Sequence, residues 1–238
     1  MKQVIAMHGW AGDSNTWSVW ASEFQKTNWL WQSVERGYGD ITPFHPNWII
    51  TEEIKNHQRR VVIAHSLGPH LIPETILKYA TDIVFLCSFS RFIPTSGRNR
   101  SLKTALQGMY KSLGTDNEEK MLINFLKKAC APESLHEVRP GPITKGLSLE
   151  GRKKLKSDLQ LLIQTKGLPN GIATKCRVLI IQGAKDSIIV PESRSYLKED
   201  LTNHLDNPPS YWEIPEAGHL LLMPMLIKRV QTWLNTHP

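Results

Sequence analysis

Cysteine is scarce in this chain of 238 residues, which contains only Cys87, Cys130 and Cys176. These three are widely spaced and odd in number, which argues against a disulfide framework or a zinc site and fits a reducing compartment. No apolar stretch approaches the ~20 residues that a membrane helix requires. The first residues also lack the charged and apolar regions of a secretory signal. We therefore expect a soluble, cytoplasmic protein without stable membrane insertion.

Internal repeats and low-complexity segments are absent as well, and the length is that of a single α/β catalytic domain. Strand-like apolar runs occur at residues 4–7, 29–33, 61–65, 83–88, 178–182 and 211–214. Helical patterns lie between them at residues 14–26, 48–56, 67–79, 192–204 and 220–235. Such alternation predicts an α/β fold with right-handed crossovers and a mostly parallel central sheet of about six strands.

The run Val61-Val62-Ile63-Ala64-His65-Ser66-Leu67-Gly68 stops abruptly at a serine that has small residues two places before and two places after it. This pattern is typical of a nucleophile elbow, a sharp strand-to-helix turn that exposes a serine hydroxyl. Ala64 stands where a first glycine is usual and still leaves room for the turn. An ordinary turn with a capping serine is the alternative.

Two further polar residues follow later strand-like runs. Asp186 comes shortly after residues 178–182, and His219 comes shortly after residues 211–214. Ser66 needs a base to become a nucleophile; His219 is the candidate base, and Asp186 would orient its imidazole. Alone, the aspartate fits a turn cap and the histidine an ordinary loop. The order Ser, Asp, His is that of α/β-hydrolases.

A glycine-containing loop, His8-Gly9-Trp10-Ala11-Gly12, follows the first strand-like run. Glycines let such a backbone approach a reacting carbonyl. We expect the backbone N–H groups of Trp10 and Leu67 to form an oxyanion hole. The same loop also fits a turn that precedes a helix capped by Asp13 or Ser14.

Taken together, H-G-W-x-G, A-H-S-L-G, G-x-x-D and G-H, spread over residues 8 to 219, resemble the α/β-hydrolase superfamily. The tryptophan after His-Gly, the compact size and the short spacing resemble the BioH-like esterases. That resemblance implies hydrolysis of the methyl ester of pimeloyl-acyl carrier protein during biotin synthesis, without a metal or organic cofactor. The elbow departs from this group, whose usual motif is G-W-S-L-G, because Ala64-His65 replaces Gly-Trp.

The stretch between the fourth and fifth strand-like runs is helical in pattern at residues 102–113, 117–129 and 148–165. We expect residues 1–89 and 169–238 to form the hydrolase core and residues 90–168 to form an inserted helical lid. A lid after this strand would lie over the carboxyl ends of the strands, where open α/β sheets bind ligands. Its walls for an acyl chain would include Trp10, Leu67, Phe125 and Leu126. Phe125 and Leu126 resemble a Phe-Leu pair of the BioH-like acyl site, and burial within a lid helix explains them equally well.

The lid carries fifteen Lys or Arg and seven Asp or Glu, a net charge of +8, whereas the whole chain is +7. A surface of one sign beside an active site attracts anionic partners. Acyl carrier protein is small and acidic and fits this surface; a merely solvated face and an anionic membrane surface are alternatives. No nucleic-acid module is recognisable. The candidate partner-binding residues are Arg91, Arg98, Arg100, Lys127, Lys128, Arg152, Lys153 and Lys154.

The sequence thus predicts a serine carboxylic-ester hydrolase that acts on an acyl chain, carried by acyl carrier protein or presented as a small ester, and that is a monomer. Three other functions fit the same motifs. They are a general small-ester or lipid esterase, an acyl thioesterase, and a non-catalytic binding protein on this fold.

Overall fold

The computed structural model describes residues 1–50, 58–95, 99–221 and 223–236. Its centre is a sheet in the order β2-β1-β3-β4-β5-β6, and each neighbouring pair of these strands is parallel. The strands are β1 (Lys2–Met7), β2 (Trp29–Val34), β3 (Arg59–His65), β4 (Asp82–Leu86), β5 (Arg177–Gly183) and β6 (Ser210–Ile214). The prediction of six mostly parallel strands is confirmed.

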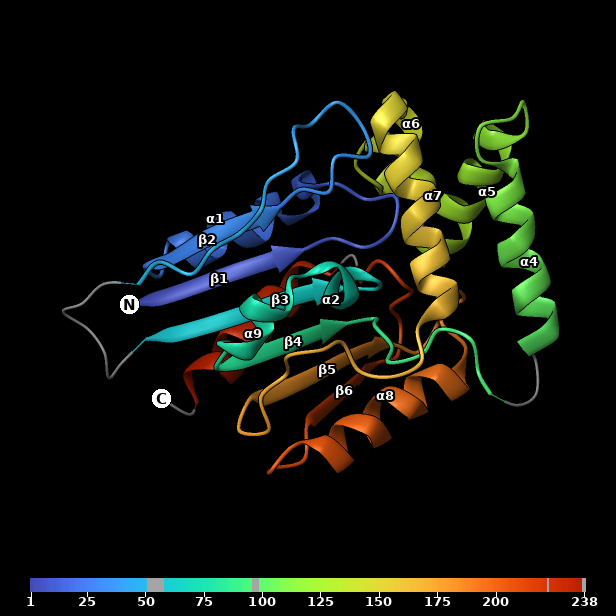
Figure 1. The fold of residues 1–238 in the computed structure, drawn as a ribbon. Helices are drawn as coiled ribbons and strands as arrows, with labels where there is room; N and C mark the ends of the chain where they lie inside the picture. Colours follow the sequence, from blue (N-terminus) through green and yellow to red (C-terminus); the bar gives the residue numbers. More distant parts are fainter. Residues whose placement is uncertain (51–57, 96–98, 222, 237–238) are drawn as a thin grey trace.

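The strands are apolar on both faces, as expected for a parallel sheet covered by helices on each side. Along β3, Val61 and Ile63 pack in one cluster, and Val62 and Ala64 pack in another. The first cluster includes residues of α1 (Ser18–Gln25) and α9 (Pro224–Asn235), together with Trp17 at the end of the 3-10 helix η1 (Ser14–Trp17). The second includes residues of α3 (Glu74–Lys78) and α8 (Pro191–His204). Figure 1 shows the resulting three layers.

Between β4 and β5 lie the lid helices α4 (Asn99–Ser112), α5 (Glu118–Cys130), α6 (Pro142–Lys145) and α7 (Leu149–Gln164), with the short 3-10 helix η2 (Leu135–Glu137). Figure 1 shows α4, α5, α6 and α7 beyond the carboxyl ends of the strands, where the sequence predicts the lid. We call residues 90–168 the lid below. None of the described helices is long and apolar enough to cross a membrane.

Two predicted helices differ in the structure. The segment expected to be one helix over residues 67–79 forms α2 (Gly68–Leu71) and α3, since Ile72 precedes Pro73 and is extended. The last helix begins at Pro224 rather than at residue 220, because Leu221 has a φ of +48° that no helix accommodates. Of the helix expected over residues 48–56, residues 48–50 have no regular structure and residues 51–56 lie outside the described residues.

Candidate active site

Ser66 lies at the turn between β3 and α2 with a φ of +55°, in the left-handed region that residues other than glycine rarely adopt. Its N–H donates to the Leu86 carbonyl at 2.9 Å, and its own carbonyl accepts from the Ser88 hydroxyl at 2.7 Å. Strained conformations of this kind persist where the surroundings fix them, and they cluster at active sites. The backbone around Ser66 thus has the strained turn of a nucleophile elbow.

Small residues around Ser66 are required by close backbone approach. A Cβ added to Gly68 would lie 2.7 Å from the Met7 carbonyl oxygen, and one added to Gly9 would lie 2.9 Å from the Ser66 Cβ. Ala64 is fully buried in the strand that leads to the turn. The glycines of the sequence motif therefore let the end of β1 and the start of α2 pass beside the elbow.

The structure brings Ser66, His219 and Asp186 together at the carboxyl ends of β3, β6 and β5. The Nε2 atom of His219 is 3.1 Å from the Ser66 Oγ, and its Nδ1 is 2.9 Å from the Asp186 Oδ2. All three residues are buried. Since the carboxylate accepts the Nδ1–H, the Nε2 lone pair faces the serine hydroxyl, which is the arrangement that lets His219 take the serine proton.

Asp186 is held as an anion by its surroundings. Burial opposes its charge, but His219 and the N–H groups of Ile188 and Ile189 outweigh it and lower the pKa of Asp186 to about 2. Those N–H groups donate to Oδ1 at 2.7 and 3.0 Å, which leaves Oδ2 for the imidazole. A charged Asp186 is thus available to stabilise an imidazolium.

The two N–H groups expected to form the oxyanion hole flank Ser66. Trp10 follows Gly9, at which an added Cβ would lie 2.9 Å from the Ser66 Cβ, and Leu67 follows Ser66 directly. Within the part of the chain that the structure describes, neither the Trp10 nor the Leu67 backbone N–H donates to a protein acceptor. Two unused donors beside a nucleophile suit an oxyanion.

His65 is a site residue for which the sequence pattern predicts no role. Its Nε2–H donates to the carbonyl oxygen of His219 at 2.8 Å, and the two imidazole rings lie 4.8 Å apart. Burial and the neighbouring His219 lower the pKa of His65 to about 3. His65 is therefore a neutral donor that holds the backbone of His219. The contact spans 154 positions, so no local sequence signal reveals it.

Cys87, Asp186 and His219 place their potential metal-ligand atoms within 4.8 Å of one another. The Nδ1 of His219 is already bonded to Asp186. Burial raises the pKa of the Cys87 thiol, and its sulfur accepts from the Gly183 N–H at 3.4 Å. A protonated thiol is a poor metal ligand. The cluster fits a hydrogen-bonded triad better than a metal site.

Two cavities meet at Ser66. The first, with a volume of about 390 Å³, is bordered by His219; we call it the His219 chamber. The second, with a volume of about 500 Å³, lies among α4, α5 and α7; we call it the α7 chamber. Trp10, Ser66 and Phe125 line both cavities.

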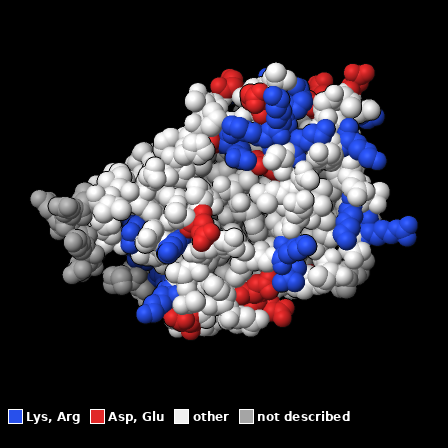
Figure 2. Space-filling view, viewed as in Figure 1, with Lys and Arg blue, Asp and Glu red and all other residues white. Residues whose placement is uncertain are grey.

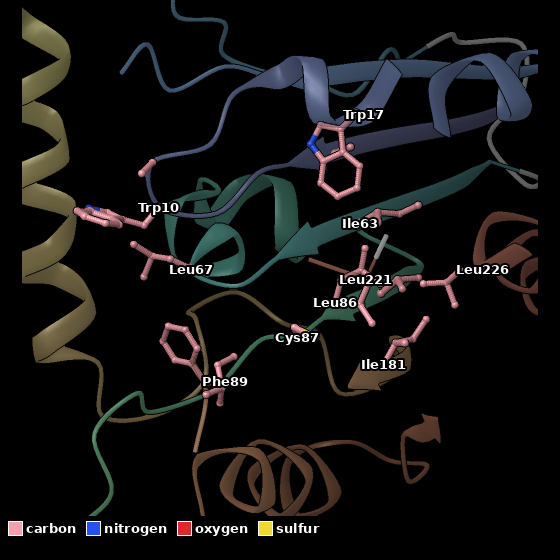
Figure 3. Close-up of a cluster of buried hydrophobic side chains, with 14 of the residues drawn as sticks. Trp10, Trp17, Ile63, Leu67, Leu86, Cys87, Phe89, Ile181, Leu221 and Leu226 are labelled. Atoms are coloured by element: carbon pink, nitrogen blue, oxygen red, sulfur yellow. The ribbon is translucent and has the colours of Figure 1, made fainter. Parts of the chain in front are cut away.

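The four residues expected as walls of the substrate pocket have different positions. Trp10 and Phe125 line both chambers, and Leu126 lines the His219 chamber. The side chain of Leu67 lines neither chamber, because it is fully buried among the side chains of a hydrophobic cluster (Figure 3). Leu67 as a wall is thus a wrong prediction.

Helix α7 is anchored to the core at several points. The Trp10 indole N–H donates to the Leu155 carbonyl at 2.8 Å, and Figure 3 shows this ring extended toward the helix. Arg36 donates to both oxygens of Asp158 at 2.6 Å, and the Tyr38 hydroxyl donates to it at 2.7 Å. The wall of the site that α7 forms is therefore fixed to the loop after β2.

Figure 2 shows Lys and Arg side chains gathered over the lid. Several of the candidate partner-binding residues are engaged within the protein. Arg91 pairs with Asp200, Arg152 with Glu118 and Lys153 with Glu150. Lys154 donates to the Arg36 carbonyl. The remaining described candidates, Arg100, Lys127 and Lys128, are exposed, and Arg98 lies outside the described residues.

Comparison with protein-family models finds no match, and comparison with curated proteins finds none either. Solved structures do match. An esterase from Exiguobacterium antarcticum has 15% identity and a TM-score of 0.67, with 98% of this chain and 91% of that chain covered. A bromoperoxidase from Bacillus anthracis has 15% identity and a TM-score of 0.67, with 98% and 90% covered.

An α/β-hydrolase enzyme named MGS-M2, from a Medee basin deep-sea metagenome library, has 15% identity and a TM-score of 0.67, with 100% and 90% covered. At such identity the likeness concerns the fold. The parallel sheet, the helices on both faces and these matches together show that the chain has the α/β-hydrolase fold.

Proposed function

We propose that this protein is a serine carboxylic-ester hydrolase. The observation that carries the proposal is the continuous hydrogen-bonded chain from Ser66 Oγ through His219 to Asp186, at the meeting point of two cavities. A structural role does not require a strained serine, a buried ionised aspartate and two unused N–H donors at one point.

The geometry supports acyl transfer in two halves. His219 Nε2 takes the proton of Ser66 as Oγ attacks the ester carbonyl, and the Trp10 and Leu67 N–H groups stabilise the oxyanion. The carbon–oxygen bond to the alcohol then breaks, and the alcohol leaves with the proton from His219. Water, deprotonated by His219 in turn, hydrolyses the acyl-enzyme and restores Ser66.

The test is Ser66→Ala against Ser195→Ala, an equivalent change at an exposed serine of α8. We expect p-nitrophenyl butyrate hydrolysis and labelling by a fluorophosphonate to be lost in the first variant and kept in the second. A wild-type protein that neither hydrolyses esters nor takes the label contradicts the proposal and favours a binding protein. Preference for the matching thioester indicates a thioesterase instead.

A narrower function concerns the source of the acyl chain. We propose that it arrives on an acidic acyl carrier protein, for which the BioH-like resemblance implies the pimeloyl methyl ester as substrate. The observation that favours this is a pair of exposed lysines, Lys120 and Lys128, that line the α7 chamber. Neither has an ion-pair partner among the described residues, so both are free to attract an anionic carrier.

The experiment compares Lys120→Glu/Lys128→Glu with Lys78→Glu/Lys175→Glu, which changes the net charge equally on exposed lysines outside the lid. For the wild type, hydrolysis of a carrier-bound pimeloyl methyl ester is expected to fall as salt is added. At low salt, the first variant should hydrolyse this ester more slowly than the wild type, and the second variant should not. The reference substrate is free p-nitrophenyl acetate, whose two-carbon acyl group is too short to fill the α7 chamber, and its hydrolysis should change little with salt or in either variant. If carrier-bound and free esters respond alike, no carrier docks at the lid.

A further inference from the structure

We propose that the two chambers divide the substrate at Ser66, so that the α7 chamber holds the acyl chain and the His219 chamber holds a bulky, apolar alcohol. This inference rests on the proposed ester hydrolysis and adds the chemical class of the leaving group, which is a bulkier alcohol than the methanol of the pimeloyl ester that the BioH-like resemblance implies. Its basis is the composition of each chamber, the partition between them and the position of His219.

The His219 chamber has a largely apolar wall. It is built from the loop after β1, η1 and α1, from the lid helices α5 and α6 with the segment between them, and from the loop after β6 and α9; charged Asp13, Glu137 and Arg139 also line it. Its apolar side chains include Trp17, Trp20, Ile143, Leu221, Met223 and Ile227. Apolar walls of this kind favour apolar substituents, because their burial removes apolar surface from water.

The α7 chamber is a separate space between the lid helices. Leu102, Leu106 and Met109 of α4, Met121 of α5, and Leu159 and Leu162 of α7 line it. Its shape follows from three helices packed side by side, and its polar residues, among them Asn117, Lys120 and Lys128, are exposed. An aliphatic chain buried along α7 with its far end near solvent fits this distribution.

Trp10 and Phe125 separate the chambers. Their rings meet edge to face, with centroids 5.0 Å apart and an angle of 86° between the planes. The bond from the Trp10 indole to the Leu155 carbonyl holds its ring in place. Both residues line both chambers beside Ser66, so the partition stands at the reacting atom.

Proton transfer decides which half of the ester enters which chamber. When the carbon–oxygen bond breaks, its electron pair stays on the alcohol oxygen, which must take the proton from His219 Nε2. That oxygen therefore lies on the His219 side. His219 lines the first chamber and is absent from the wall of the second, so the alcohol extends into the first.

The size of the His219 chamber excludes a snug fit for methanol. Methanol has two heavy atoms and fills about 60 Å³ on the basis of about 30 Å³ for a water molecule. The chamber offers about 390 Å³. A methyl ester would leave most of this apolar space to water, whereas an octyl or aryl alcohol would bury its surface there.

The experiment uses two esters with opposite shapes, octyl acetate and methyl decanoate, and one filling variant for each chamber. Ile143→Trp fills the His219 chamber and Met109→Trp fills the α7 chamber; both replace half-buried apolar residues of lid helices. If either variant fails to fold, Val138→Trp and Ala105→Trp fill the same chambers from other positions.

We expect Ile143→Trp to lower kcat/KM for octyl acetate by about tenfold and for methyl decanoate by less than about twofold, and Met109→Trp to do the reverse. Wild type should also prefer octyl over methyl esters of the same acid by about tenfold. A reversed crossover, equal effects on both esters, or a preference for the methyl ester overturns the inference alone. Absence of any Ser66-dependent hydrolysis overturns the proposed function and this inference with it.

Discussion

Replacing Asp158 with alanine removes the carboxylate that joins helix α7 to the loop after β2. Asp158 is almost completely buried and accepts three hydrogen bonds: two from Arg36 at 2.6 Å and one from Tyr38 at 2.7 Å. Without it, the guanidinium of Arg36 and the buried Tyr38 hydroxyl lose their shared partner. The change therefore tests whether α7 is a fixed wall of the site.

The expected cost follows from the burial of the pair. Removing one partner of a buried ion pair costs about 3–5 kcal/mol, because the other charge is left uncompensated. Since the Arg36 side chain is 31% exposed, water hydrates part of its charge, and we expect the lower end, about 3 kcal/mol. At a urea m value of about 3 kcal/mol/M, the unfolding midpoint falls by about 1 M.

The assay is urea unfolding of Asp158→Ala, of the double variant Arg36→Met/Asp158→Leu, and of Arg152→Met as a control. The double variant should recover part of the loss, because it removes both charges and keeps apolar volume, while the buried Tyr38 hydroxyl still lacks its acceptor. Arg152→Met breaks a more exposed lid pair with Glu118 and should cost less than about 1 kcal/mol. An unchanged midpoint in Asp158→Ala, or a double variant as unstable as the single one, would refute this account of the anchor.

Three further outcomes are expected. His65→Phe removes the donor to the His219 carbonyl and should lower kcat about tenfold in steady-state assays, with KM unchanged. His65→Gln keeps a donor and should lose less activity. Equal activity of the two variants would contradict the positioning role. Gly68→Ala should lower the thermal midpoint and abolish hydrolysis because its Cβ meets backbone at 2.7 Å, whereas Gly108→Ala, with nothing within 4 Å, should be neutral or stabilising by up to about 1 kcal/mol. Burial opposes the charge of Glu35, but His8 and two backbone N–H groups lower its pKa from 4.5 to about 2. The contribution of Glu35 to the free energy of unfolding is therefore present above pH 4.5 and is lost as the pH falls toward 2. Unfolding measured at several pH values should show a shallower acid dependence in Glu35→Gln.

The sheet and the triad were predictable because their signals are local. Each of Ser66, Asp186 and His219 follows an apolar run closely, and the carboxyl ends of parallel strands share one edge of the sheet. Distance along the chain therefore did not hide their proximity. Gly9 and Gly68 were also predictable from the sequence, because the close neighbours at these two positions leave no room for a Cβ.

The rest depends on contacts that no local pattern encodes. The pairing of Arg36 with Asp158 spans 122 positions, and each residue alone looks like an ordinary surface charge. The predicted net charge of the lid also counted Arg91 and Arg152, which the structure pairs with acidic residues. The place of Leu67 beside Ser66 predicts a pocket wall, but its side chain is buried in the core.

The anchoring of α7 indicates which helices of the lid can be substituted without disturbing the catalytic residues. Helix α4 packs mainly on α7 and α5, not on the sheet, so α7 is the platform that supports it. Leu102, Leu106 and Met109 of α4 line the α7 chamber, whereas Trp10 and the triad are held by the core and by α7. Substitutions on the chamber face of α4 should therefore change which acyl chains bind while the geometry at Ser66 stays intact. Helix α7, which is fixed to the core, thus supports the geometry of the catalytic residues, whereas helix α4, which packs on α7, supports the choice of acyl chain.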